Sequence, residues 1–206
     1  GYRALESSNG GTNNPAVGSR ALEDTTTGDH NTAIGFNAIH ANTTGGYNVA
    51  MGGYALDENT TGNSNTAIGY GSLSVNTTAS KNTAVGELAM NVATTGAHNT
   101  AVGQGSLQAN TTGASNTAVG RLAADGVTTG SHNVAVGDLA YRNNTTGSYN
   151  TVVGVGALSG SATTDGNTAI GYFALNQTTT GTENVSVGYN SLASASTDSW
   201  NTAVGR

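Results

Sequence analysis

The chain repeats one short pattern with a strict period of 17 residues. An Asn followed three residues later by an aliphatic residue or Met, and then by Gly, recurs twelve times between Asn14 and Asn201. The sequence divides into a partial unit at 1–13, eleven full units at 14–200 and a partial unit at 201–206. Because both ends fall inside a unit, we expect one continuous repeat array that is a fragment of a longer fibre.

Residue types are sorted by their place in the unit, which we number from position 1 at the Asn. Position 5 is always Gly, position 8 is always Ala or Ser, and position 9 is nearly always a long apolar residue. All eighteen charged residues fall at positions 6, 7, 10, 11, 15, 16 or 17. A disordered low-complexity chain has no reason to sort its charges in this way. The period therefore indicates a folded, stacked structure.

A unit of 17 residues is too short for a pair of helices, which needs about 30 residues. Gly, Thr, Asn and Val are also poor helix formers. We therefore predict an all-β fold, a parallel β-roll or β-solenoid with about twelve rungs of 17 residues. Strands are expected at positions 1–4 and near positions 7–10, and the glycines at positions 5 and 15 are expected at corners. At about 4.8 Å per rung, the rod would be about 55–60 Å long.

The Asn at position 1 is the main structural candidate. In a stack of rungs each amide can donate to the carboxamide oxygen of the next, so the column is predicted to form a ladder. The alternative is a row of amides that binds a ligand, and the ladder is favoured because each Asn directly precedes the apolar strand. The predicted ladder comprises Asn31, Asn48, Asn65, Asn82, Asn99, Asn116, Asn133, Asn150, Asn167 and Asn184.

Aromatic side chains at position 6 are the candidates for contact with another molecule. They are Phe36, Tyr70, Tyr172 and Tyr189. Tyr172 and Tyr189 would lie on neighbouring rungs, where their rings either stack for stability or present a contact patch. The stabilising interpretation is favoured.

No residue pattern indicates catalysis, a metal or a cofactor. Cys is absent and the serines have no His at a recurring offset, which argues against a nucleophilic enzyme. His98 and His132 share position 17 but would lie two rungs apart, too far for one metal ion. His40 has no evident ligand neighbour. We therefore expect that the protein is not an enzyme and that it holds no metal and no cofactor.

Net charge and hydropathy limit the kinds of molecule that this chain can bind. The net charge is −6, and Lys81 is the only lysine, so the chain has no basic cluster of the kind that binds nucleic acid. Its apolar runs are only a few residues long, so we expect no membrane insertion by this segment.

The run from Asn65 to Leu73, Asn-Thr-Ala-Ile-Gly-Tyr-Gly-Ser-Leu, resembles the head repeats of YadA-like trimeric autotransporter adhesins, and similar units occur in trimeric bacteriophage tail fibres. The resemblance extends over the whole chain. It implies a left-handed parallel β-roll that associates in threes and mediates adhesion to a host surface. It also implies that the aliphatic residue at position 4 faces the core and that the small residue at position 3, such as Ala67, faces partner subunits. The Asn-Thr-Thr-Gly corner makes this unit longer than the usual head repeat.

These observations predict a structural and adhesive segment of an extracellular fibre, on a cell or virion surface, that displays variable residues to an unknown receptor. A homotrimer is also expected on physical grounds, because two apolar positions per rung give a thin core. The alternative function is ice binding, suggested by the Thr columns, the low charge and the regular rise. A flat, exposed Thr-x-Thr face would favour ice binding, whereas the Thr-Thr-Gly corner speaks against it.

Overall fold

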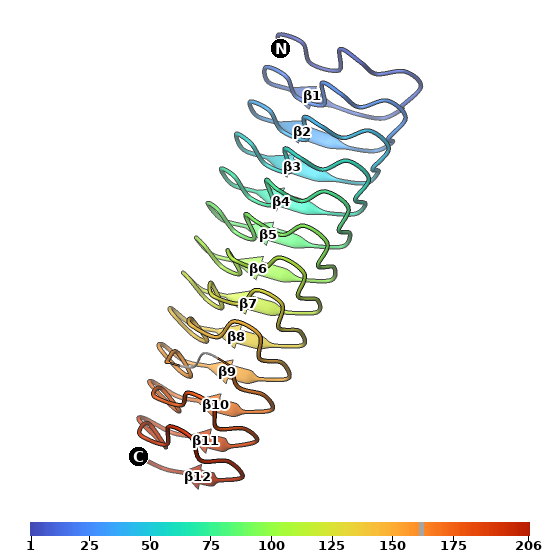
Figure 1. Cartoon of the computed structure of the whole chain (residues 1–206). Helices are drawn as coiled ribbons and strands as arrows, with labels where there is room; N and C mark the ends of the chain where they lie inside the picture. Colours follow the sequence, from blue (N-terminus) through green and yellow to red (C-terminus); the bar gives the residue numbers. More distant parts are fainter. Residues whose placement is uncertain (161–162) are drawn as a thin grey trace.

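The chain winds into a β-solenoid in which every turn contributes one short strand to a single sheet (Figure 1). The computed structural model describes residues 1–160 and 163–206, which form twelve strands and no helix. The strands are β1 (Ala16–Val17), β2 (Thr32–Ile34), β3 (Val49–Met51), β4 (Thr66–Ile68), β5 (Thr83–Val85), β6 (Thr100–Val102), β7 (Thr117–Val119), β8 (Val134–Val136), β9 (Thr151–Val153), β10 (Thr168–Ile170), β11 (Val185–Val187) and β12 (Thr202–Val204).

Neighbouring strands are parallel and stay in register along the whole rod. The order of strands in the sheet follows the order in the chain from β1 to β12. Ala67 on β4 pairs with Ala50 on β3 and with Ala84 on β5. Each strand contacts only the strands before and after it. The predicted all-β solenoid and its rung of 17 residues are confirmed.

Each strand ends just before the glycine of position 5. Gly69, which follows β4, has a φ angle of +128°, and a Cβ atom on it would lie 2.5 Å from the carbonyl oxygen of Gly86 on the next rung. Only glycine tolerates both this backbone conformation and this close approach. The recurring glycine therefore fixes the corner at the end of every strand.

The second strand expected near positions 7–10 is not found in the described residues, and that prediction was wrong. The chain instead passes through a turn in which positions 7 and 9 are left-handed, as at Tyr54 (φ 58°) and Leu56 (φ 54°). The backbone of this turn still forms hydrogen bonds with the neighbouring rungs. The N–H of Leu56 donates to the carbonyl of Ser72 at 3.0 Å, and the N–H of Tyr54 donates to the carbonyl of Phe36 at 2.8 Å. Paired left-handed residues thus curl the chain without breaking the bonding between rungs.

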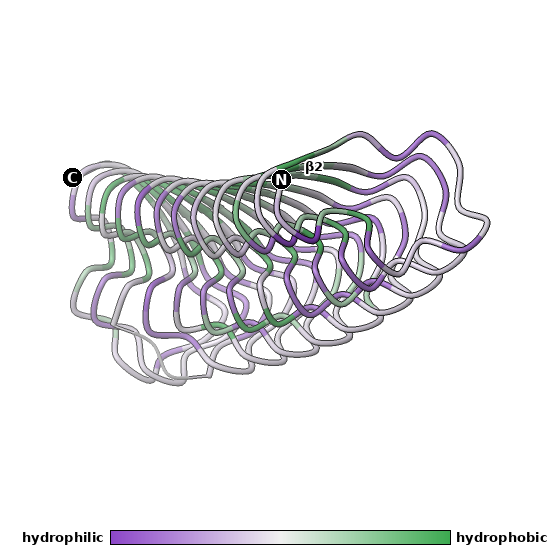
Figure 2. Cartoon of the chain, turned by 90° about the horizontal axis from the view of Figure 1, so that it is seen from above, coloured by the Kyte–Doolittle hydropathy of each residue, from purple (hydrophilic) through white to green (hydrophobic). Residues whose placement is uncertain are grey.

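The core is a narrow stack of small, apolar and amide side chains. Position 3 points inward, and Ala33 and Ala67 are fully buried. Position 9 fills most of the remaining interior, as Leu56 shows by its complete burial. Position 4 points outward, where Ile34 is 39% exposed and Val102 is 36% exposed. Figure 2 shows the stacked strands as one continuous side of the rod, with hydrophobic residues running along it from rung to rung.

The expectation that position 4 faces the core and position 3 faces a partner subunit was therefore wrong. Successive residues of a strand point to opposite faces, so positions 3 and 4 cannot both enter the core. The interior already holds the position 9 side chain and the buried Asn residues, so position 3 is mostly Ala, and Val152 is the largest side chain buried there. The larger aliphatic side chains therefore lie on the outer face of the sheet.

Candidate functional site

The Asn column at position 1 forms a continuous, buried ladder. The side-chain amide of Asn48 donates to the side-chain oxygen of Asn31 at 3.1 Å and to the carbonyl oxygen of Gly62 at 2.8 Å. The first bond joins two rungs, and the second closes the rung to which Asn48 belongs. All ten predicted members are hydrogen-bonded in this column and at most 1% exposed: Asn31, Asn48, Asn65, Asn82, Asn99, Asn116, Asn133, Asn150, Asn167 and Asn184.

On some rungs the residue at position 12 is also a buried Asn, and these residues form a second column. The amide of Asn59 donates to the side-chain oxygen of Asn42 at 2.9 Å, and the amide of Asn76 donates to Asn59 at 2.7 Å. All three residues are fully buried. Because both columns use their amides inside the rod, neither of them can serve as a row of ligand-binding amides.

The exposed face of the sheet, which we call the outer sheet face, consists of the side chains at positions 2 and 4 of the twelve strands. From β2 to β12 position 2 is Thr or Val, and Val134 and Val185 are each 37% exposed there; before β1 this position is Pro15. Position 4 is an unbroken apolar column: Val17, Ile34, Met51, Ile68, Val85, Val102, Val119, Val136, Val153, Ile170, Val187 and Val204. Exposed contiguous apolar surface of this kind is typical of an interaction site.

The two Thr columns of the corner differ in exposure. At position 13 the hydroxyl of Thr43 donates to the carbonyl oxygen of Thr60 on the next rung at 3.0 Å, and the hydroxyl of Thr60 donates in the same way to Thr77. At position 14 the side chains are exposed, as at Thr44 and Thr61. The corner therefore presents one exposed Thr column, whereas the Thr residues at position 2 of the outer sheet face are mostly half-buried and are interrupted by Val49, Val134 and Val185.

The sequence-predicted aromatic residues belong to two separate surface clusters. In the first, Tyr54 lies between Phe36 and Tyr70 in edge-to-face contacts, with ring centroids 5.2 and 5.7 Å apart. In the second, Tyr172 and Tyr189 stack with centroids 5.1 Å apart. Sequence reasoning missed Tyr54 because it considered position 6 alone, although a side chain at position 7 lies next to the position 6 residues of both adjoining rungs.

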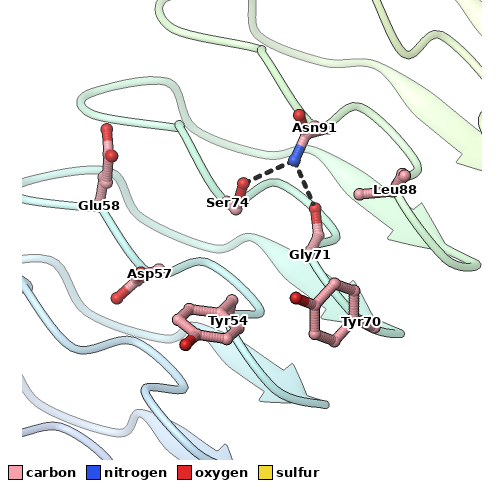
Figure 3. A pocket seen from close by; sticks show the side chains of 8 residues that line it. All are labelled: Tyr54, Asp57, Glu58, Tyr70, Gly71, Ser74, Leu88 and Asn91. Carbon is pink, nitrogen blue, oxygen red and sulfur yellow. Dashed lines mark hydrogen bonds between the residues drawn. The ribbon is translucent and has the colours of Figure 1, made fainter.

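A cavity of about 260 Å³ opens beside the first aromatic cluster (Figure 3). Figure 3 shows Tyr54 and Tyr70 next to each other at one end of this cavity and Asn91 at the other. The amide of Asn91 donates to the hydroxyl oxygen of Ser74 at 2.7 Å and to the carbonyl oxygen of Gly71 at 3.1 Å. The lining comes from three consecutive rungs: Tyr54, Asp57 and Glu58, then Tyr70, Gly71 and Ser74, then Leu88 and Asn91.

A charged cluster surrounds His40 next to this cavity. The Nε2 atom of His40 lies 3.5 Å from a carboxylate oxygen of Glu23, and its Nδ1 atom lies 3.5 Å from Oδ1 of Asp57. A hydrogen bond from Arg20 holds the pKa of Glu23 below its ordinary value, whereas burial raises the pKa of Asp57. The expectation that His40 has no neighbour of a ligand type was wrong, because the turn at positions 7–10 brings these carboxylates to it.

The histidines of position 17 lie on an exposed edge. His30 stacks on Tyr47 with ring centroids 4.9 Å apart, and His132 stacks on Tyr149 at 5.2 Å. Across residues 1–160 and 163–206, no three His, Cys, Asp or Glu side chains are grouped so that they could hold a metal ion. The histidines of position 17 thus pack against aromatic rings of the next rung at the two places where such a ring is present.

Comparison with protein-family models, with curated protein sequences and with solved structures gives no match to this chain. No helix in the described residues has the length and hydropathy to cross a bilayer.

Proposed function

We propose that the chain is a structural and adhesive part of an extracellular fibre, on a cell or virion surface, in which three copies associate side by side. The observation that supports this proposal most strongly is the outer sheet face, whose apolar column continues from β1 to β12. Monomeric soluble proteins rarely expose contiguous apolar surface of more than a few hundred Å². A second and a third chain would cover this surface.

The composition of the outer sheet face fits a protein contact. None of the eighteen charged residues occurs at positions 2 or 4 in any unit. The side chains there are mostly β-branched, so little rotamer freedom is lost when they are covered. Three such faces that meet around a threefold axis would bury all three columns together. The number of chains comes from the resemblance to trimeric adhesins and tail fibres.

In this proposal the residues at the variable positions of the rod make the contacts with the receptor. Stacked rungs form a spacer, and positions 6, 7, 10 and 11 present residues such as Tyr70 and Tyr189 at regular intervals. Since these side chains are exposed in the single chain, they are available to an unknown receptor.

Ice binding is the second candidate. It is favoured by the outer sheet face, where Thr at position 2 lies beside an aliphatic residue at position 4 on a regularly spaced surface. Because this pattern is Thr-x-Val or Thr-x-Ile rather than Thr-x-Thr, the fibre proposal ranks first. Appreciable thermal hysteresis in a solution of the protein would reverse this ranking.

The association state tests the fibre proposal directly. Light scattering of the wild-type protein should give three times the 20.3 kDa mass of one chain. A double variant, Val102→Glu and Val119→Glu, places two carboxylates on the outer sheet face and should reduce the mass to that of one chain. The matched control is Gln104→Glu and Gln108→Glu, which adds the same charge away from that face and should leave the trimer intact. A wild-type mass of a single chain, or a double variant that remains trimeric, would refute the proposed contact.

A further inference from the structure

We propose that the cavity beside Tyr54 and Tyr70 binds a lysine or arginine side chain of a partner polypeptide (Figure 3). This inference rests on the proposed adhesive function and names the chemistry that one displayed site would recognise. Three features carry it: a hollow that a glycine leaves open, a lining whose polar side chains can all accept hydrogen bonds, and exposed aromatic faces.

Gly71 leaves the hollow open. It occupies position 7, where the rungs before and after carry the side chains of Tyr54 and Leu88. A Cβ atom on Gly71 would lie 2.9 Å from the Cδ2 atom of Leu88 and 3.6 Å from the amide nitrogen of Asn91. The Leu88 side chain therefore borders the space directly above Gly71, and the cavity of about 260 Å³ beside it suits one side chain rather than a large ligand.

The polar side chains of the cavity can all accept hydrogen bonds, and the hydroxyls of Tyr54, Tyr70 and Ser74 can also donate. Asp57 and Glu58 contribute two carboxylates; Oδ1 of Asp57 is buried against Nδ1 of His40 at 3.5 Å, and Glu58 is exposed. The amide nitrogen of Asn91 is already engaged with Ser74 and Gly71, so its oxygen is the group left to bind a ligand. Ammonium and guanidinium groups carry only donors, which matches this lining.

No positive charge lines the cavity. Its eight lining residues include two carboxylates and no Lys, Arg or His. The nearest basic group to Asp57 is His40 on the preceding rung, with Nδ1 at 3.5 Å from Oδ1. A cationic ligand would therefore meet attraction from Asp57 and Glu58, whereas an anionic ligand would meet repulsion.

The aromatic rings complete the match to a basic side chain. Tyr54 is 37% exposed and Tyr70 is 58% exposed, and their rings meet nearly at right angles with centroids 5.7 Å apart. A cation within about 6 Å of such a ring face is attracted to it. The aliphatic stem of lysine or arginine can pack on Leu88 and on the same rings.

The repeat contains a second site with the same scaffold and a different lining. At this site the amide of Asn176 donates to the Ser159 hydroxyl oxygen at 2.7 Å and to the Gly156 carbonyl at 3.1 Å, as at the first site. Arg142 and Asn143 occupy the positions that correspond to the two carboxylates. The acidic lining is therefore a property of the first site and not a consequence of the repeat.

The inference is tested by adding small-molecule probes to the full chain and monitoring the NMR chemical shifts of its backbone amides. The probes are Nα-acetyl-lysine-N-methylamide and its arginine equivalent, and the norleucine equivalent is the neutral comparison. At least one cationic probe should saturate with a dissociation constant on the order of 1 mM, because a single small side chain contributes few contacts. The shifts should centre on Gly71 and Ser74, and the neutral probe should bind at least about tenfold more weakly.

The test variants are residues that occur naturally at the same positions of the repeat, and in Gly71→Asn only the end of the Leu88 side chain has to move aside. Gly71→Asn fills the hollow, and Asn already occupies position 7 at Asn37 (φ 53°) and Asn190 (φ 52°), so the backbone accepts it. Asp57→Asn removes one carboxylate, and position 10 naturally holds Asn at Asn91. Each variant should weaken the binding of the cationic probe about fivefold or more. The control, Gly105→Asn, makes the same change two rungs further along and should leave binding unchanged.

Three results would overturn the inference: no saturation by either cationic probe, equal binding of the norleucine probe, or unchanged binding in Gly71→Asn. Saturation by glucosamine without saturation by the lysine or arginine probe would overturn it in favour of a saccharide site. Light scattering of the same sample separates the two proposals. A single-chain mass with intact binding refutes only the fibre contact, and a trimer that binds no probe refutes only the cavity assignment.

Discussion

The side-chain oxygen of Asn65 accepts a hydrogen bond from the backbone N–H of Asn82 at 3.0 Å, so a side chain of one rung binds the main chain of the next. The amide of the same Asn65 donates to the carbonyl oxygen of Ala79 at 2.9 Å and closes its own rung. One buried side chain therefore supports both the closure of a turn and its stacking on a neighbour.

Asn65→Ala should lower the free energy of unfolding by about 2–4 kcal/mol, because a buried N–H and a buried carbonyl lose their partner together. Denaturant unfolding followed by circular dichroism measures this loss. Gln104→Ala removes an exposed amide on another rung and should change stability by less than about 0.5 kcal/mol. Equal effects of the two substitutions would contradict the structural contribution of the ladder.

Gly69→Ala should destabilise the rod by about 2 kcal/mol or more, because its φ angle of +128° and the Gly86 oxygen 2.5 Å from a new Cβ both oppose a side chain. Gly53→Ala is the matched control, since a Cβ there would lie 3.5 Å from the nearest atom, a Tyr70 ring carbon, which is an ordinary contact. Thermal unfolding of the two variants measures the difference. A Gly69→Ala protein as stable as Gly53→Ala would show that the corner does not need glycine.

The inward direction of position 3 can be tested with two enlargements on β7. Ala118 is fully buried, so Ala118→Leu should overpack the core and cost about 1–3 kcal/mol of unfolding free energy. Val119 is 37% exposed on the outer sheet face, and Val119→Ile should be within about 0.5 kcal/mol of wild type. Denaturant unfolding at one fixed protein concentration compares them. A larger loss of stability for Val119→Ile than for Ala118→Leu would indicate that position 4, and not position 3, faces the core.

Asp57→Asn should raise stability at neutral pH. Burial is the main cause that raises the pKa of Asp57, with further effects of His40, Glu58 and Arg20. Between the ordinary and the raised pKa, the folded protein binds more protons than the unfolded chain, so stability falls as pH rises through that window. The gain from Asp57→Asn should therefore appear as pH rises through the window and be absent below the ordinary pKa of about 3.9. Unfolding measurements over a pH series check this, and a gain that is largest in acid would contradict it.

Glu23→Gln should have the opposite dependence on pH. The hydrogen bond from Arg20 lowers the pKa of Glu23, so the ionised carboxylate stabilises the fold at neutral pH. This contribution is lost as pH falls through the depressed pKa of the folded state. The same pH series should therefore show a less stable variant at neutral pH and no difference from wild type in strong acid. A Glu23→Gln protein that is as stable as wild type at neutral pH would rule out this contribution.

The sequence predicted the solenoid because a strict period and the sorting of charges leave few other folds. It also suggested a ladder for Asn48 and its equivalents, since an uncharged polar residue that recurs beside an apolar strand needs a recurring partner. The turn at positions 7–10 was missed because Leu at position 9 gives no signal for a left-handed backbone, yet Leu56 has a φ angle of 54°. Gly, Asn and Asp are the residues that normally mark that conformation.

The directions of positions 3 and 4 could not be read from alternation, which shows that two faces exist but not which one is inside. The structure decides between the two faces, since Ala67 is fully buried and Ile68 is 36% exposed. The cavity was also beyond the sequence, because it requires Gly71 to lie between two rungs that carry side chains at position 7. A glycine at a position otherwise occupied by side chains was the only available signal.

The strict succession of strand contacts has a consequence for the history of the gene. Because β6 contacts only β5 and β7, and all three have the same register, the surfaces joined at each seam are nearly interchangeable. Unequal crossing-over between copies of the unit would lengthen or shorten the molecule by whole turns and leave a seam like every other. Descendants of this gene could thus change the length of the rod without inventing a new interior.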